Sequence, residues 1–510
     1  MTRRHDAIVV GAGLGGLAAA TTLAQNGLDV LLLERHNVPG GYASSFVRDR
    51  YEFEVSLHEL SGIGTPERPG QLYQYFEEIG VCPELEFYRA PTLHQAVFPD
   101  RSITLPPGRE AYEETICREF PHEQPGIHRF LDRVFDTSED FEVIAASNGK
   151  VSKLGNPFTL PSRLRHLLRY LPTTWGPVLN RDVSDPAARA VLSQLWGYLG
   201  LPPAKISFVS FALLLYAYLV NGSAYPRGRS QALSSALLRA FERFGGTQRM
   251  GCGVSRIVTD GGKIRGVITE QGERIEAPFV LSNADPVTTC RDLMEPGAVP
   301  RRFFDRLRTA AASTSSFNVY LGAARTAAEL GLDAHEIFIN SDYDFDQHEE
   351  AMHVVGPLEN FSITCHNVVY PDFSPPGTSI VVLTAMVYGE PWYDVPPEQY
   401  VDTKNRVAET MLAAAERVAP GLRDAAEVVE VSTPLTNMRY AGAIHGAIYG
   451  CDGPAWNSML LRMGQRGPVD GLYLVGAWTL PGGGFEPAIT TGRLAAAQLL
   501  TRLGKEPAKV

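Results

Sequence analysis

The pattern of hydrophobic positions near the N-terminus predicts a strand, a helix and a second strand. Residues 7–10 and 30–33 are short, continuous apolar runs, and the segment 16–25 between them is rich in alanine and leucine. A short apolar run is typical of a parallel strand buried on both faces, and the longer segment is typical of a helix packed against it. This order predicts a β-α-β unit and therefore an α/β fold.

The rest of the chain alternates between helical and strand-like patterns. Residues 71–224 contain mainly helical patterns joined at proline-rich turns. The segments 316–321, 361–366 and 379–386 carry the β-branched and aromatic residues that favour strands. A helical pattern over 400–418 would cover the resulting sheet. We therefore expect a mixed β-sheet and a set of helices besides the first β-α-β unit.

Two helical segments carry apolar residues in a way that suggests two different environments. Leucines recur with helical spacing on one face of the first segment, at Leu164, Leu167, Leu168 and Leu171. Basic residues take most of the other positions, at Arg163, Arg165, His166 and Arg169. Such a helix either docks on the core or lies in an anionic membrane interface. The second segment, 206–220, is uncharged but shorter than the ~20 residues that span a bilayer, so we expect it to line a cavity or pack in the core.

A glycine-rich segment lies between the first predicted strand and its helix. Residues 11–16 read Gly-Ala-Gly-Leu-Gly-Gly. Gly11 permits a tight turn, Gly13 lets backbone N–H groups approach a pyrophosphate, and Gly16 lets the helix pack closely on the strand. Glu34, at the end of the second strand, is the acidic residue that accepts hydrogen bonds from a ribose. The pattern predicts a dinucleotide site.

The residues that follow Glu34 narrow the dinucleotide to a flavin. The segment 34–46 contains a second glycine pair, and further related motifs stand at 225–228, 282–286 and 433–440. Together these segments resemble the phytoene desaturase family of flavoproteins, which also includes carotenoid cis–trans isomerases and retinol saturases. The resemblance implies FAD as the cofactor and an oxidoreductase that acts on carbon–carbon bonds.

Two segments resemble different branches of this family. Residues 433–450 are similar to the stretch shared by saturases and isomerases, whereas residues 481–485 are similar to carotenoid desaturases. Arg229 also departs from the family, because many members have a glycine there. The branch, and with it the direction of the redox step, stays open at the level of the sequence.

The resemblance implies how the chain is divided into domains. A Rossmann-like FAD-binding domain would be built from three discontinuous segments, 1–70, 225–300 and 465–510. A substrate-binding domain with a mixed β-sheet and helices would take 71–224 and 301–464. Its helical region near 160–220 would include the possible membrane contact.

A set of residues spread over the cofactor segments is expected to hold the FAD. They are Gly11, Gly13, Leu14, Gly15, Gly16, Glu34, Arg35, Gly40, Gly41, Tyr42, Val254, Gly476, Ala477, Glu486, Ala488 and Ile489. By the resemblance, the backbone of Val254 would meet the adenine. A helix beginning near Ala488 would point its N-terminus at the isoalloxazine and stabilise negative charge on the reduced ring.

Four side chains are candidates for chemistry or substrate contact. Glu486, in the glycine-rich turn beside the flavin, would transfer a proton or would act as a helix N-terminal residue and hydrogen-bond acceptor. By the resemblance, His58 stands in a segment that passes near the flavin, and it would be an acid, a polarising group or part of the pocket wall. His445 and Tyr449 would face the substrate or hold buried structural positions.

Composition and charge exclude several other classes of protein. The formal net charge is -11 with both signs mixed along the chain, so we expect no nucleic-acid partner. The six cysteines are scattered, no metal-ligand spacing is present, and no G-x-S-x-G motif marks a hydrolase. The first strand begins within a few residues of Met1, which leaves no room for a targeting segment. We expect a cytoplasmic protein, either free in the cytoplasm or peripheral on the inner face of the cell membrane.

The sequence therefore predicts an FAD-dependent oxidoreductase acting on a lipophilic polyene or isoprenoid. Dehydrogenation by hydride transfer to the flavin, as in carotenoid desaturases, is the first interpretation. A retinol-saturase-like reductase and a cis–trans isomerase using reduced FAD are the alternatives. A polyene or lipid carrier with a structural flavin is an alternative of another class. The sequence does not identify the electron acceptor or donor.

Overall fold

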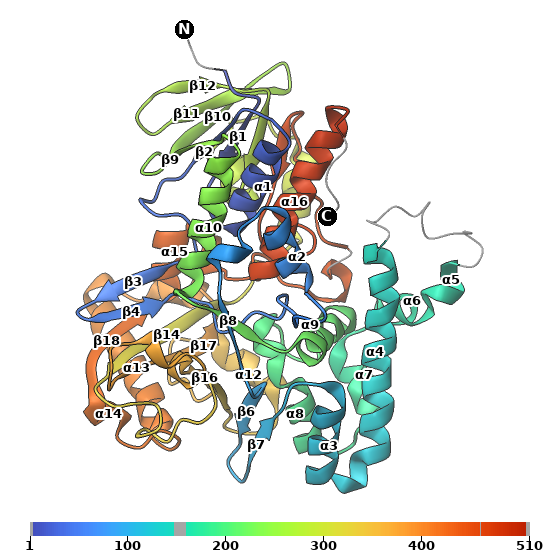
Figure 1. Ribbon diagram of the computed structural model, residues 1–510, viewed down its shortest axis with the longest axis vertical. Coiled ribbons are helices and arrows are strands. Elements are labelled where there is room, and N and C mark those ends of the chain that lie inside the picture. Colours follow the sequence, from blue (N-terminus) through green and yellow to red (C-terminus); the bar gives the residue numbers. More distant parts are fainter. Residues whose placement is uncertain (1–3, 147–159, 459–460, 506–510) are drawn as a thin grey trace.

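The computed structural model describes residues 4–146, 160–458 and 461–505. Figure 1 shows an α/β region at one end of the long axis. A large sheet and a group of helices lie side by side at the other end. The two chain ends lie close to the α/β region, so the N-terminal and C-terminal segments meet there although they are far apart in sequence.

A five-stranded sheet forms the centre of the α/β region. Its strands follow the order β19-β13-β1-β2-β9, and neighbours run parallel. The strands are β1 (Ala7–Val10), β2 (Val30–Leu33), β9 (Thr247–Arg249), β13 (Phe279–Ser282) and β19 (Leu472–Leu474). The strands predicted at 7–10 and 30–33 are confirmed. All five strands come from segments predicted for FAD binding, although the division into domains itself stays a prediction.

Both faces of this sheet are buried, because each is covered by another layer of the protein. Alternate residues of each strand point to opposite faces, so they pack against different layers. Ala7 and Val9 belong to the core beneath three helices, whereas Ile8 and Val10 face a small second sheet. The helices are α1 (Leu14–Gln25), α10 (Arg229–Arg243) and α16 (Phe485–Arg502). The small antiparallel sheet contains β10 (Val254–Asp260), β11 (Lys263–Thr269) and β12 (Arg274–Glu276).

Glycines allow α1 and α16 to pack closely. A methyl group at Gly492 of α16 would lie 2.1 Å from the carbonyl oxygen of Gly15. Figure 1 shows the two helices beside each other, one from each end of the sequence. Their contact holds the first glycine loop and the C-terminal segment at the same edge of the sheet.

The second large sheet has seven strands in the order β18-β14-β17-β16-β15-β6-β7. The strands are β6 (His94–Val97), β7 (Ser102–Leu105), β14 (Ser315–Ala323), β15 (Glu336–Ile339), β16 (Phe361–Thr364), β17 (Ser379–Val387) and β18 (Ala426–Ser432). β14, β16 and β17 confirm the three predicted strands. One face packs against α13 (Tyr400–Ala415) and α14 (Leu422–Ala425), and α13 ends earlier than the predicted helix.

The segment 71–224 is less uniformly helical than its pattern predicted. β6 and β7 pair as a hairpin, and β6 joins the edge of the seven-stranded sheet by running parallel to β15. Two further strands, β5 (Phe87–Arg89) and β8 (Ala224–Pro226), pair with each other. Strands of three or four residues give too short a periodic pattern to distinguish from turns, so pairing with distant segments decided these elements.

Helices fill the remainder of this segment. They are α2 (Gln71–Glu78), α3 (Arg109–Glu119), α4 (Gln124–Ala146), α7 (Trp175–Asp182), α8 (Pro186–Ser193) and α9 (Phe208–Asn221). Aromatic rings join α4, α7 and α9, with the Phe130 and Trp175 centroids 4.7 Å apart and those of Trp175 and Phe211 4.2 Å apart. Three other helices are α11 (Arg301–Arg308), α12 (Phe345–Met352) and α15 (Pro434–Ala441).

The predicted basic amphipathic helix is divided into two short helices, α5 (Leu160–Arg163) and α6 (Arg165–Tyr170). Leu164 and Leu167 are buried, whereas the side chain of Leu168 is 50% exposed. The carboxylate of Asp140 in α4 accepts hydrogen bonds from the backbone N–H groups of His166 and Leu167. Most of the leucine face is therefore docked on the protein. No helix in the described ranges is long and apolar enough to cross a membrane.

A hairpin of β3 (Ser45–Arg48) and β4 (Tyr51–Glu54) connects the α/β region to the seven-stranded sheet. Phe46 and Phe53 stack on each other, and Phe46 meets Tyr320 of β14 edge to face at 5.1 Å between centroids. Arg48 and Glu430 of β18 form an ion pair at 2.7 Å. The hairpin thereby fixes the course of the following residues, which run along the cavity described below.

Candidate active site

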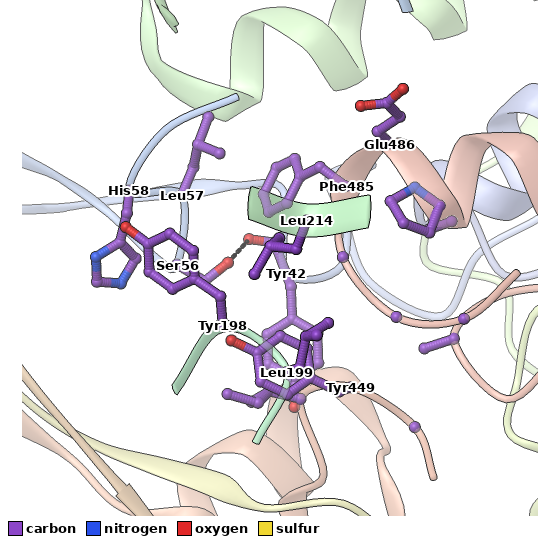
Figure 2. Close-up of a pocket in the computed structure, with 18 of the residues that line it drawn as sticks. Tyr42, Ser56, Leu57, His58, Tyr198, Leu199, Leu214, Tyr449, Phe485 and Glu486 are labelled. Carbon is purple, nitrogen blue, oxygen red and sulfur yellow. Dashed lines mark hydrogen bonds between the residues drawn. The ribbon is translucent and has the colours of Figure 1, made fainter. Parts of the chain in front are cut away.

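A cavity of about 1380 Å³ lies where the α/β region, the helices and the seven-stranded sheet meet. Its walls come from the loop between β1 and α1, residues 55–61 after β4, helix α9, strands β14 to β17, and the segment 475–488. Figure 2 shows a part of this cavity with Glu486 on one side and His58 on another. Segments far apart in sequence thus build one site.

The first glycine loop is as tightly packed as the dinucleotide motif requires. Gly11 has a positive φ of 94°, and a methyl group at Gly16 would lie 2.0 Å from the carbonyl oxygen of Gly11. Methyl groups at Gly13 and Gly15 would lie 2.6 and 2.7 Å from the side-chain amide of Asn283. No side chain caps the N-terminus of α1, and Gly13, Leu14 and Gly15 line the cavity. Backbone N–H groups are therefore available to an anion there.

Glu34 lies at the end of β2 beside this loop. Its carboxylate accepts hydrogen bonds from the backbone N–H groups of Ala12 at 2.6 Å and His36 at 2.8 Å. The N–H of Cys252 donates to the carbonyl oxygen of Glu34 at 2.7 Å, which brings Val254 to the same end of the sheet. Arg35 turns toward α15, where its guanidinium donates to the carbonyl oxygen of Arg439 at 3.4 Å.

The second glycine pair adjoins the first loop. The N–H of Gly40 donates to the carbonyl oxygen of Ala12 at 2.8 Å. A methyl group at Gly40 would lie 2.1 Å from the carbonyl oxygen of Ala43, and Gly41 has a positive φ of 61°. The hydroxyl of Tyr42 donates to the carbonyl oxygens of Gly446 and Ala447 at 3.3 Å. Gly40, Gly41 and Tyr42 all line the cavity.

The C-terminal glycine segment supplies the facing wall. Gly476 has a positive φ of 91°, and its N–H donates to the hydroxyl of Thr491 at 2.7 Å. A methyl group at Gly483 would lie 2.6 Å from the Cα of Tyr449. Gly476, Ala477, Glu486 and Ala488 line the cavity. The close backbone approach explains why this segment has so many glycines.

Helix α16 begins at Phe485, three residues before the start predicted near Ala488. Pro487 occupies the first turn, where a backbone N–H has no partner within the helix, so proline is tolerated there. Glu486 is consequently in the first turn of α16.

The carboxylate of Glu486 has no hydrogen-bond partner among the residues that the structure describes. Burial raises the pKa of Glu486 to about 7. A group with this pKa exchanges protons near neutral pH. A methyl group at Gly62 would lie 2.1 Å from Oε2 of Glu486, so the glycine makes room for the carboxylate.

His58 and Tyr449 both line the cavity. Nδ1 of His58 lies 3.1 Å from each carboxylate oxygen of Glu336. Burial opposes the charged imidazolium, but the nearby carboxylates, Glu336 first among them, together outweigh burial and the pKa of His58 is raised. The hydroxyl of Tyr449 donates to the carbonyl oxygen of Gly197 at 3.1 Å, and its ring remains part of the wall (Figure 2).

His445, expected to face the substrate or to hold a buried structural position, is not among the residues that line this cavity. It has a positive φ of 52°, and its Nδ1 lies 3.0 Å from the hydroxyl of Tyr393. The turn after α15 directs it away, so adjacency to Tyr449 in sequence did not place both residues at one site. Among the expected cofactor residues, Gly11, Gly16, Glu34, Arg35, Val254 and Ile489 also lie outside the cavity lining.

The remaining wall of the cavity is largely apolar. Helix α9 contributes Leu213, Leu214, Ala217 and Val220, which confirms that the uncharged segment 206–220 lines a cavity. Tyr198, Glu59 and Phe338 complete the part of the wall near His58. Sequence reasoning missed Tyr198 and Glu336, because neither stands in a motif and both reach the site through the tertiary fold.

These features fit FAD. At Gly13, Gly15, Gly40 and Gly41 the backbone borders the cavity without a side chain. The N-terminus of α1 offers N–H groups, and Glu34 stands at the end of β2. The fold and the site thus define a dinucleotide-binding flavoprotein. Within the residues that the structure describes, no group of three or more His, Cys, Asp or Glu side chains forms a metal site.

Comparison with known proteins identifies the family. Residues 14–500 match the family described as flavin containing amine oxidoreductase, and the chain belongs to it. The protein is therefore an FAD-dependent oxidoreductase, as the sequence predicted.

Three relatives are similar over nearly the whole chain. The prolycopene isomerase of Daucus carota is 25% identical over 99% of this chain and 81% of its own. The all-trans-retinol 13,14-reductase of Danio rerio is 26% identical over 98% of this chain and 86% of its own. The phytoene desaturase of Neurospora crassa is 28% identical over 100% of this chain and 87% of its own. The predicted resemblance is confirmed.

Solved structures agree on the fold. An oxidoreductase from Methanosarcina mazei has a TM-score of 0.63 at 16% identity, with coverage of 98% of this chain and 100% of that chain. A putrescine oxidase solved with putrescine bound has a TM-score of 0.64 at 18% identity, with coverage of 98% and 100%. The predicted α/β class with a mixed sheet and helices is confirmed.

Proposed function

We propose that the protein oxidises or reduces carbon–carbon bonds of a lipophilic polyene or isoprenoid. The observation that carries the proposal is the continuity of the cavity: the glycine loops that fit FAD open into a wall formed by the apolar side chains of α9. An elongated apolar molecule would lose water on entering this space, which favours binding. The relatives named as a prolycopene isomerase, a retinol reductase and a phytoene desaturase support this substrate class.

Different residues of the cavity would bind the cofactor, bind the substrate and exchange protons. Gly13, Gly15, Gly40 and Gly476 hold the cofactor through their backbones, and the first turn of α16 faces the cavity. FAD, when bound, accepts or supplies a hydride. The apolar side chains of α9 exclude water and orient the substrate. Glu486, whose pKa burial raises to about 7, and His58, whose pKa is also raised, are cavity side chains suited to proton exchange.

Dehydrogenation is the proposed direction. The segment 481–485 resembles carotenoid desaturases, and the Neurospora crassa phytoene desaturase has the highest identity of the three relatives described above, 28%. Saturation and redox-neutral isomerisation use the same cofactor and substrate class, so the direction of electron flow has to be measured.

An anaerobic visible spectrum of the purified holoprotein tests the function. We expect a lipophilic polyene from a panel of carotenoid precursors and retinoids to bleach the oxidised flavin band. If only a chemical reductant or NAD(P)H bleaches the band and a polyene restores it, the protein is a saturase. Isomerisation would change the polyene spectrum with reduced flavin and no net bleaching. A bound polyene that never changes would favour a carrier and overturn the proposal.

Contact with a membrane surface, on the inner face of the cell membrane, belongs to the proposal as well. Leu168 is exposed beside Arg165 and Arg169, an arrangement that suits an anionic interface. Flotation with anionic vesicles tests this contact, and Leu168→Glu is expected to reduce the floated fraction. Equal flotation of both proteins would contradict the contact through α6.

A further inference from the structure

Two histidine–glutamate pairs cross each other at the wall of the cavity. His58 contacts Glu336 through Nδ1 at 3.1 Å, and Nε2 of His335 lies 2.9 Å from Oε2 of Glu59. Two neighbouring residues after β4 thus pair with two neighbouring residues at the start of β15. The crossed arrangement fixes the segment 58–59 against the seven-stranded sheet.

The two pairs differ in their access to the cavity. The side chains of His335 and Glu59 are both 1% exposed, so this pair is almost fully buried although Glu59 borders the cavity. Glu336 is fully buried, but the side chain of His58 is 20% exposed. Nε2 of His58 has no hydrogen-bond partner among the described residues. Because Nδ1 is held by Glu336, Nε2 is the ring nitrogen left to face the cavity, where Figure 2 shows the imidazole beside Tyr198.

The carboxylate of Glu336 is itself held in place. The hydroxyl of Thr364 donates to its Oε2 at 2.7 Å, and Glu336 and Thr364 are direct partners across the β15–β16 pair. Burial disfavours the carboxylate, but His58, His335 and the Thr364 hydroxyl together outweigh burial, with His58 contributing most, and the pKa of Glu336 is lowered. Glu336 is therefore a fixed negative charge next to the imidazole.

Several other ionisable groups surround His58. Glu54 and Glu59 favour its charged form, although more weakly than Glu336. His335 and His366 lie close enough for their charges to interact with it. The ring of Tyr198 is 6.2 Å away between centroids, and burial raises the pKa of Tyr198. Among these groups, Glu336 makes the direct contact and has the largest favourable effect on the imidazolium.

We propose that His58 transfers the proton that accompanies the carbon–carbon redox step, and that Glu336 is the positioning residue that sets its orientation and charge. This inference rests on the proposed function. In dehydrogenation, one substrate carbon loses a hydride to the flavin and its neighbour loses a proton to Nε2 of neutral His58. The electron pair of the second C–H bond becomes the new π bond. In saturation, the imidazolium returns the proton and the π electrons form the C–H bond, while reduced flavin supplies the hydride.

The variant Glu336→Gln tests the positioning role without flavin or substrate. We label histidine with ¹³C in the apoprotein and follow the titration of His58 by NMR, assigning its signal through its loss in His58→Gln. The titration midpoint is expected to fall by at least about one pH unit, because the paired charge is removed while burial persists. Glu113→Gln is the matched control, since the largely buried Glu113 pairs with the exposed His128 and neither residue lines the cavity. This control is expected to leave the His58 titration unchanged.

The pH dependence of turnover tests proton transfer. In either redox direction, the limb of the profile that reports His58 is expected to move to lower pH in Glu336→Gln, by the same interval as the NMR midpoint. If Glu336→Gln does not fold, Glu336→Asp keeps the charge with a shorter reach and is expected to shift both midpoints in the same direction. If Glu336 had only a structural role, Glu336→Gln would lower the melting temperature without shifting this limb of the pH profile.

The possible failures are distinguishable. Turnover of a polyene with an unmoved limb overturns the role of His58 and leaves the proposed function intact. An unmoved NMR midpoint overturns the role of Glu336. If no polyene reacts with the wild-type holoprotein in either direction, the proposed function fails and the proton-transfer role fails with it.

Discussion

A methyl group at Gly62 would lie 2.1 Å from Oε2 of Glu486, so the missing side chain at Gly62 creates the space that the carboxylate occupies. Gly62 precedes α2 and Glu486 is in the first turn of α16, more than four hundred residues later. This contact links the wall near His58 with the C-terminal glycine segment, and it makes the position of Glu486 dependent on both.

The first prediction concerns this contact. Gly62→Ala is expected to destabilise the protein by about 1–3 kcal/mol, because the added methyl group displaces the Glu486 carboxylate. In a Glu486→Ala background the same substitution should cost much less, since the clashing atoms are gone. Urea unfolding of the four proteins of this cycle measures the coupling. Equal costs in both backgrounds would show that the two residues are independent.

The second prediction concerns the titration of Glu486. Its pKa is about 7 in the folded protein and 4.5 ordinarily, so between these values the folded state holds a proton that the unfolded chain has released. Stability from this group therefore falls as the pH rises from 4.5 to about 7. Glu486→Gln removes that loss, so its melting temperature relative to wild type should be higher at pH 8 than at pH 5.

Glu398→Gln provides the control for this measurement, because Glu398 is exposed. Its difference in melting temperature from wild type is expected to be the same at both pH values. A pH-independent difference for Glu486→Gln as well would mean that the carboxylate is not perturbed in the folded protein.

The third prediction concerns cofactor binding. Gly16→Ala would place a methyl group 2.0 Å from the carbonyl oxygen of Gly11, so the loop has to move. Overpacking of this kind costs about 1–3 kcal/mol, which corresponds to roughly 5- to 150-fold weaker FAD binding if the displaced loop is the one that binds. Flavin fluorescence during reconstitution of the apoprotein measures the affinity. Gly356→Ala is the matched control, because a methyl group there meets no atom within 4 Å.

The fourth prediction separates the substrate wall from the cofactor site. Ala217 of α9 lines the cavity, and Ala217→Trp would fill apolar space beside this helix. Polyene affinity is expected to fall about tenfold or more, equivalent to at least about 1.4 kcal/mol, while FAD content stays at the wild-type level. Quenching of flavin fluorescence by the polyene measures the affinity. Ala328→Trp is the control, and because Ala328 is exposed it should leave the polyene affinity unchanged. An unchanged affinity in Ala217→Trp would mean that the substrate binds elsewhere.

The site could be predicted from the sequence where short motifs carry the chemistry. The run 11–16 and the strands beside it were sufficient to predict a dinucleotide loop, because strand, glycines and helix are consecutive and their geometry is local. The segment 475–488 was placed at the same cofactor only through the family resemblance, and the structure brings both segments to one cavity. Pro487 illustrates the limit of local rules, since its effect depends on its position within the helix.

Only one member of the His58–Glu336 pair could be predicted from the sequence. His58 was a candidate because it stands in a segment resembling one that passes the flavin, but Glu336 gave no signal, since a single glutamate before an apolar run is also typical of a surface strand. The pairing of β15 with β6 and β16 buries this position and places it 3.1 Å from His58. His445 is the opposite case: it lies near Tyr449 in sequence, but a turn directs it away from the cavity that Tyr449 lines.

The sequence by itself determined the class of protein, since hydrophobic runs and glycine spacing act over a few residues and specify the α/β unit and its phosphate-binding loop. The tertiary structure alone decided which distant side chains meet: Gly62 with Glu486, His58 with Glu336, and α9 with the cofactor loops. Such contacts depend on strand order and helix packing, which are settled by burial of the whole chain and not by any local pattern.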